Sequence, residues 1–250
     1  MSAFEKASSV YEKFGADEPF YAVLSHGQYK RRRLDVDAFY SNGRQQIDEL
    51  MSDIERRGIR LGRHRALDFG CGVGRLSNAL ANHFQHVVGV DVSNSMIATA
   101  RQHCRRRNCE FVVNKKVDLG DFPTASFDFV FSDITIQHIP PPASENYVRD
   151  FIRLLKPDGL AIFLIPDGPQ YKRDSIGERW ERFCREQVRP FAKRVRGKHA
   201  VQIHYLARQR VEGLVTMAGG TLLATEVHPD WTSCSRPYKP LYYWAKRSVT

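Results

Sequence analysis

The chain has 250 residues, of which 42% are hydrophobic and 26% are charged. This length and composition fit one α/β domain with a substantial core, and they exclude a fibrous or disordered chain. The formal net charge of +10 raises the local concentration of anionic partners, but it does not choose among them.

The cysteine usage and the hydropathy predict the compartment. The five cysteines are odd in number and scattered, without a C-x-x-C pair, and residues 1–10 hold no secretory apolar segment. The longest apolar run, Leu160 to Ile165, is too short to cross a bilayer. We therefore expect a cytoplasmic protein with reduced thiols and no transmembrane segment.

Residues 1–60 are predicted to form a helical cap before the first strand. Apolar residues recur at helical spacings over residues 39–54, and either Asp35 or Asp37 is the expected N-cap of that helix. The earlier segment 18–24 is predicted to be extended or a turn, because its proline disfavours helix at the preceding residue.

A glycine-rich segment follows the first predicted strand, in the run Ala66-Leu67-Asp68-Phe69-Gly70-Cys71-Gly72-Val73-Gly74. Glycine lets the backbone adopt left-handed angles and lets a ligand approach closely, while the next helix offers free N–H groups. The dinucleotide pattern G-x-G-x-x-G is incomplete, because Arg75 and Ser77 stand where the third glycine would be. Asp68 would repel phosphates and suits a cationic ligand. The segment predicts a nucleotide-type pocket.

Strands and helices alternate along residues 65–165. Such alternation implies right-handed crossovers and a parallel sheet, with ligands at the carboxyl ends of its strands. The predicted strands lie near 65–69, 86–91, 109–113, 127–132, 160–165, 222–227 and 241–246, and the helices near 74–83, 95–106, 145–155 and 208–217. Residues 166–205 interrupt the pattern with a basic helical insertion.

Four later signals occur in a fixed order after the glycine segment. An acid ends the second strand at Asp91, where it can accept from both hydroxyls of a ribose. The segments Asp118-Leu119-Gly120-Asp121, Gln137-His138-Ile139-Pro140 and Leu155-Lys156-Pro157-Asp158-Gly159 follow. With the glycine segment, they resemble the class I S-adenosylmethionine (SAM)-dependent methyltransferases over residues 60–165.

The resemblance implies an α/β, Rossmann-like class I methyltransferase fold. Its seven-stranded, mostly parallel sheet would carry helices on both faces. Residues 1–60 would form the N-terminal helical cap, and residues 61–250 the SAM-binding domain, with a substrate-region insertion after the fifth strand at about 166–205.

The resemblance also implies that SAM is the cofactor. It places Asp68 near the methionyl ammonium, Asp91 on the ribose, Met96 on the adenine face, and Asp118 with the Leu119 backbone on the adenine amino edge. The full expected cofactor-binding set is Asp68, Gly70, Cys71, Gly72, Gly74, Asp91, Val92, Met96, Asp118, Leu119 and Ser132.

His138 and Asp133 are the predicted catalytic residues. Transfer from a sulfonium depends mainly on alignment, and the acceptor must sit near the end of the fourth strand, which His138 follows. A neutral imidazole there can act as a general base for a hydroxyl, or it can merely cap the next helix. Asp133 can assist His138, hold a divalent cation with another carboxylate, or be a solvated strand-end acid. The sequence therefore leaves open whether the site binds a divalent metal ion.

The leading hypothesis is a SAM-dependent methyltransferase, and the presence of a base candidate favours O-methylation over N-methylation. Its acceptor would be a small molecule or a sugar or glycan, and an anionic one would be attracted by the basic run 172–198. A nucleic-acid methyltransferase is an alternative that the +10 charge favours, but Ser132-Asp133-Ile134-Thr135 replaces the N/D-P-P-Y motif of base N-methyltransferases. A catalytically silent SAM-fold binding module is the other alternative. The sequence fixes neither the acceptor nor the oligomeric state.

Overall fold

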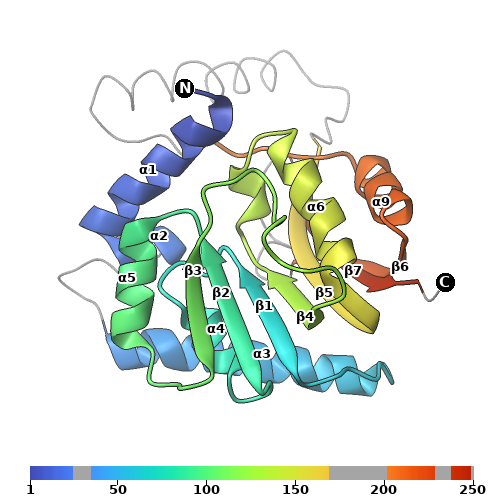
Figure 1. Ribbon diagram of the computed structural model, residues 1–250, viewed down its shortest axis with the longest axis horizontal. Coiled ribbons are helices and arrows are strands. Elements are labelled where there is room, and N and C mark those ends of the chain that lie inside the picture. Colours follow the sequence, from blue (N-terminus) through green and yellow to red (C-terminus); the bar gives the residue numbers. More distant parts are fainter. Residues whose placement is uncertain (25–34, 169–201, 229–237, 249–250) are drawn as a thin grey trace, which may run out of the picture.

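The computed structural model describes residues 1–24, 35–168, 202–228 and 238–248 (Figure 1). Its centre is a seven-stranded sheet in the order β3-β2-β1-β4-β5-β7-β6. Strands β1 to β5 are parallel, β7 is antiparallel to β5, and β6 is antiparallel to β7. The strands are β1 Arg65–Phe69, β2 His86–Asp91, β3 Cys109–Val113, β4 Phe127–Ser132, β5 Leu155–Asp167, β6 Gly220–Val227 and β7 Lys239–Arg247.

Helices cover both faces of this sheet (Figure 1). Side chains of α3 and α4 pack on one face, and those of α6 and α9 pack on the other. The helices are α1 Ala3–Asp17, α2 Pro19–Val23, α3 Val36–Arg56, α4 Arg75–Leu80, α5 Asn94–His103, α6 Ala143–Leu154 and α9 Arg208–Met217, and a 3-10 turn, η3, spans Ile136–His138. The predicted seven-stranded, mostly parallel fold is confirmed.

The alternation of side chains along β1 explains the two layers. Ala66 packs in the cluster with α3 and α4, whereas Leu67 and Phe69 pack in the cluster with α6 and α9. Both faces are apolar, as expected for a parallel sheet covered on both sides. Each fully buried Leu or Phe stabilises the fold by about 1.5–3 kcal/mol.

The helix α3 lies where the apolar spacing predicted it. Its buried residues Ile47, Met51 and Ile54 form a stripe that packs on the sheet, whereas Phe39, nearer its start, packs with Phe20, Val73 and Met96. Asp35 is the N-cap, because its carboxylate accepts a hydrogen bond from the backbone N–H of Ala38 at 2.9 Å.

The prediction for segment 18–24 was wrong. Glu18 is non-helical, with φ −142° and ψ 69°, as expected before a proline. Pro19, however, occupies the first position of the short helix α2, where its missing N–H costs nothing and its fixed φ suits a helix.

The other predicted elements agree with the structure within a few residues, except that β5 begins at Leu155 instead of 160. Most of the predicted insertion, residues 169–201, lies outside the described residues, and so does the whole basic run 172–198. Among the helices that the structure describes, none combines the length and the hydropathy that a bilayer crossing requires.

Candidate active site

A cavity of about 610 Å³ lies at the carboxyl ends of the central parallel strands. Its floor comes from the ends of β1, β2 and β4 and the residues after them, and helices α1 and α2 contribute its other walls. Seven of the predicted site residues line it: Gly70, Gly72, Asp91, Val92, Met96, Asp133 and His138.

The glycine segment forms a tight loop between β1 and α4. The N–H groups of Gly70 and Cys71 both donate to the carbonyl of Val90 on β2, at 2.7 and 3.0 Å. Gly70 has φ +77°, and a Cβ there would lie 2.1 Å from side-chain atoms of Thr135. Only glycine fits this position, which brings the loop backbone against the segment after β4.

Gly70→Ala is expected to lower the free energy of unfolding by about 2 kcal/mol more than Gly58→Ala does. Both positions have positive φ, so both replacements carry the strain of an L-residue in that region, about 1–2 kcal/mol. A Cβ at Gly58 meets nothing within 4 Å, whereas one at Gly70 overlaps Thr135. Urea denaturation of the two variants measures the difference. Equal losses of unfolding free energy in the two variants would show that Thr135 can move away from the added methyl group without an energetic penalty.

Asp91 connects the second strand to the glycine loop. One carboxylate oxygen accepts from the N–H of Gly72 and the other from the N–H of Ser93, both at 2.9 Å. Burial raises the pKa of Asp91, and these two hydrogen bonds oppose the rise. A carboxylate offers about four lone-pair sites, so Asp91 can still accept from a hydroxyl group of a ligand in the cavity.

Asp68 lies beneath the loop and does not line the cavity. Its carboxylate is buried and accepts a hydrogen bond from the hydroxyl of Ser77 at 2.6 Å. Burial raises the pKa of Asp68 to about 7, and the carboxylates of Asp133 and Asp91 contribute to the rise. Three acids are therefore close enough to influence one another, with the buried guanidinium of Arg75 opposing them.

Asp133 is held from two sides at the end of β4. Its carboxylate accepts from the Gln46 side-chain amide at 2.9 Å and from the Tyr242 hydroxyl at 2.7 Å. The carbonyl oxygen of Gln46 in turn accepts from Arg75. The following residue, Ile134, has φ 52°, a strained conformation for a β-branched residue. Among the described residues, no three His, Cys, Asp or Glu side chains gather as metal ligands.

His138 borders the cavity at the end of η3. Burial lowers its pKa to about 4, so the imidazole is neutral at physiological pH. Nδ1 lies 3.3 Å from the carbonyl oxygen of Gln202, and Nε2 lies 3.1 Å from the side-chain nitrogen of Gln137. Since a carbonyl only accepts, the proton is on Nδ1, and Nε2 carries the lone pair. The Tyr11 ring packs at 5.4 Å between centroids.

Five further predicted residues do not line the cavity. Gly74 is the N-cap of α4, and Cys71 and Ser132 are buried next to the lining residues. The carboxylate of Asp118 accepts from the Gly120 N–H, and the Leu119 N–H donates to Asp150 at 2.6 Å. These five residues support the cavity walls in this structure, and their roles toward a ligand stay predictions.

The sequence predicted an N-terminal helical cap, but neither the cavity-lining residues of α1 nor Asn114 were among the predicted site residues. Phe4, Tyr11 and Phe14 of α1 line the cavity, and burial together with the charge of Asp91 raises the pKa of Tyr11. The spacing of Phe4, Ala7, Tyr11 and Phe14 is helical, and it could have revealed an apolar face. Asn114 follows β3 and donates its amide to the Asp118 carbonyl at 2.9 Å.

The carboxylate of Glu12 connects α1 to the start of α5 through hydrogen bonds. Glu12 accepts hydrogen bonds from the N–H groups of Asn94 and Ser95 and from the Ser95 hydroxyl, all at the start of α5. An acid at a helix N-terminus is also stabilised by the helix dipole. These bonds hold α1 beside the cavity.

The comparisons with known proteins agree with this arrangement. Residues 66–159 match the family model described as a methyltransferase domain. A ubiquinone biosynthesis O-methyltransferase from Methylococcus capsulatus is 35% identical over 102 residues, which are 40% of this chain and 42% of that protein. The chain thus spans less than half the length of this curated relative.

Two solved structures cover nearly the whole chain. Magnesium protoporphyrin IX methyltransferase from Synechocystis PCC 6803 with bound SAH has a TM-score of 0.63 at 18% identity, over 99% of this chain and 100% of that one. A SAM-dependent methyltransferase from Leishmania major has a TM-score of 0.64 at 13% identity, over 97% of this chain and 83% of that one. At these identities the likeness shows the fold.

Proposed function

We propose that this chain, whose residues 66–159 form a methyltransferase domain of the class I fold, binds SAM and methylates a hydroxyl group of a small molecule. The observation that carries the proposal is the charge of the cavity. Asp91 and Asp133 line it, Asp68 lies just beneath it, and its described lining holds no Lys or Arg. Such a cavity favours a cation, and SAM carries a sulfonium and an ammonium group.

The residues present suit this cofactor. The volume of about 610 Å³ lies within the usual range for small-molecule sites. Asp91 has lone pairs for the ribose hydroxyls, Met96 and Val92 offer an apolar wall, and Gly72 exposes its backbone to the cavity. We expect SAM to bind in the micromolar range, about 8 kcal/mol, as calorimetry can measure.

The affinity for SAM is expected to rise with pH up to neutrality. A ligand ammonium favours the ionised form of Asp68, so binding releases a proton wherever the free protein holds one. With a pKa of about 7, the dissociation constant should be roughly eightfold larger at pH 6 than at pH 7.5. Calorimetry in two buffers of different ionisation enthalpy would detect the released proton.

Asp68→Asn is the matched variant for this prediction. Its amide oxygen still accepts from the Ser77 hydroxyl, but the group no longer titrates. The variant should bind SAM more weakly and lose the pH dependence below pH 7. An unchanged pH slope would show that another group takes up the proton.

His138 is the residue that we assign to proton removal. SAM, when bound, supplies a methyl group already activated for transfer. In the transfer, the acceptor oxygen would take the methyl group, SAM would leave as the neutral thioether, and Nε2 of His138 would accept the hydroxyl proton. The side-chain amide of Gln137, which lies 3.1 Å from Nε2, must move away before an acceptor hydroxyl can reach that nitrogen. Gln137 also presents a buried carbonyl oxygen that has no partner within the described residues.

The lining favours an acceptor with an apolar or aromatic body. Phe4, Phe14, Ile139 and Ile203 line the cavity together with Tyr11. The curated relative from Methylococcus capsulatus is named for O-methylation in ubiquinone biosynthesis, which supports a hydroxyl acceptor. A sugar would leave much of this apolar surface uncovered.

The decisive experiment is a transfer assay with isotope-labelled SAM and a panel of acceptors. Phenols and catechols, their amine analogues, simple glycosides and a short RNA are offered separately to the purified chain. We expect label in the phenol or catechol oxygen. Label in glycosides or RNA would overturn the acceptor class, and label in none of them while SAM binds would favour a silent binding module.

A further inference from the structure

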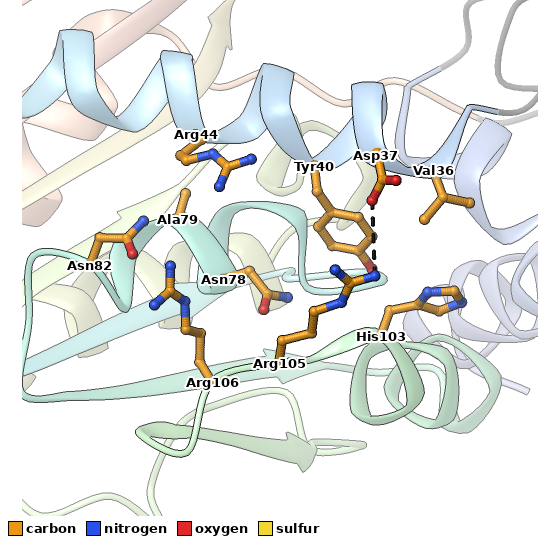
Figure 2. A pocket seen from close by; sticks show the side chains of 10 residues that line it. All are labelled: Val36, Asp37, Tyr40, Arg44, Asn78, Ala79, Asn82, His103, Arg105 and Arg106. Carbon is orange, nitrogen blue, oxygen red and sulfur yellow. Dashed lines mark ion pairs between the residues drawn. The ribbon is translucent and has the colours of Figure 1, made fainter.

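A second concavity of about 320 Å³ lies on the face of the sheet covered by α3, α4 and α5. Among the described residues, it shares none of its lining with the first cavity. Figure 2 shows Arg44 reaching in from α3, Asn78 from α4, and Arg105 and Arg106 from the segment after α5.

The two concavities differ in charge. Arg44, Arg105 and Arg106 line the second one, against a single acid, Asp37. Arg105 lies 3.9 Å from Asp37, and because both side chains are about nine-tenths exposed, this pair adds little stability. Within the described part of the chain, the guanidinium groups of Arg44 and Arg106 have neither a hydrogen-bond nor an ion-pair partner. The site therefore carries a net positive charge.

Its walls are fixed by contacts within the fold. The Tyr40 ring stacks on the His103 ring at 6.1 Å between centroids, and its hydroxyl donates to the Val73 carbonyl at 2.8 Å. Asn78 donates its amide nitrogen to the Gly74 carbonyl at 2.8 Å. The aromatic wall and the asparagine are thus held in place, while Arg44 and Arg106 remain available to a ligand and Arg105 has only its exposed pair with Asp37.

We propose that this concavity is a binding site for a small phosphate-bearing molecule. A guanidinium group offers a planar fork of donors that matches the oxygens of a phosphate, and three of them converge on one hollow. The volume fits a small ligand, and the stacked Tyr40 and His103 rings provide an apolar side for its organic part. This proposal does not rest on the proposed methyl transfer.

Inorganic pyrophosphate is the probe for this site, titrated by calorimetry at fixed ionic strength. The double variant Arg44→Gln with Arg106→Gln should weaken pyrophosphate binding by at least tenfold, because it removes two charged donors. The matched control is Arg107→Gln, an adjacent exposed arginine that does not line the site, and it should leave the affinity within twofold. Asp37→Asn should tighten binding, since it removes the one acid among the described residues that line the site.

Three results would overturn the proposal. Pyrophosphate that fails to bind the unaltered chain shows that the hollow has no phosphate site. A loss in Arg107→Gln equal to that of the double variant shows that general surface charge attracts the anion. A single-stranded RNA decamer that binds while pyrophosphate does not, and that Arg107→Gln also weakens, makes this face a nucleic-acid surface instead.

Discussion

His138→Gln is expected to lower the kcat of methyl transfer by about two to four orders of magnitude while the SAM affinity stays nearly unchanged. Glutamine retains polar contacts with neighbours such as Gln202, but it cannot accept a proton. His86→Gln is the control, because His86 is an exposed residue of β2 that pairs with Glu110. Steady-state rates with a phenolic acceptor measure the effect.

The pH dependence separates a base from a structural residue. Because burial lowers the pKa of His138 to about 4, the base is neutral and active above that pH, and the rate is lost as pH falls through it. At saturating SAM, where the titration of Asp68 no longer affects occupancy, the kcat of the unaltered chain should show no inflection near 6.5. In His138→Gln, the rate should recover as pH approaches the pKa of the phenol, about 10, since the acceptor then ionises by itself. A variant whose rate ignores pH, or near-normal turnover at neutral pH, would reduce His138 to a structural role.

Asp91→Ala is expected to weaken SAM binding by about 1.5–3 kcal/mol, or roughly 10- to 150-fold. The change removes the carboxylate that faces the cavity, and it also leaves the N–H groups of Gly72 and Ser93 without their present acceptor. Calorimetry on the folded variant measures the loss. The SAM affinity of Asp91→Asn, which keeps one acceptor oxygen, should lie between those of Asp91→Ala and the unaltered chain.

Asp48→Ala is the control for Asp91. Asp48 lies on α3, is more than half exposed and pairs only with His83 in the described structure. It should bind SAM as the unaltered chain does. A folded Asp91→Ala chain with unchanged SAM affinity would refute the ribose assignment.

The parts of this fold that the sequence predicted are those in which local pattern and tertiary environment agree. Strands β1, β2 and β4 are short apolar runs that are buried on both faces, so their composition alone identifies them. Asp91 and Asp133 were found because parallel strands end at one edge of the sheet, and Gly70 because a left-handed turn requires glycine. These inferences need no knowledge of distant contacts.

The parts that the sequence did not predict depend on residues far apart in the chain. Nothing local to Asp133 shows that Gln46 and Tyr242 hold its carboxylate, because these contacts span 87 and 109 residues. The low pKa of His138 likewise comes from burial, which the sequence does not display. The prediction for segment 18–24 used only the rule that a proline disfavours helix at the preceding residue, Glu18. A proline also favours the first position of a helix, which is where Pro19 lies.

The walls of the first cavity come from two separate stretches of the chain. The strand ends and the glycine loop belong to the stretch that matches the methyltransferase family model, whereas α1 and α2 precede it. Phe4, Ser8 and Phe14 line the cavity from α1, so substitutions there alter its wall without changing the strand ends, whereas Tyr11 also packs on His138. Under the proposed function, substitutions at Phe4, Ser8 and Phe14 change which acceptor the cavity admits while the residues assigned to SAM at the strand ends stay as they are.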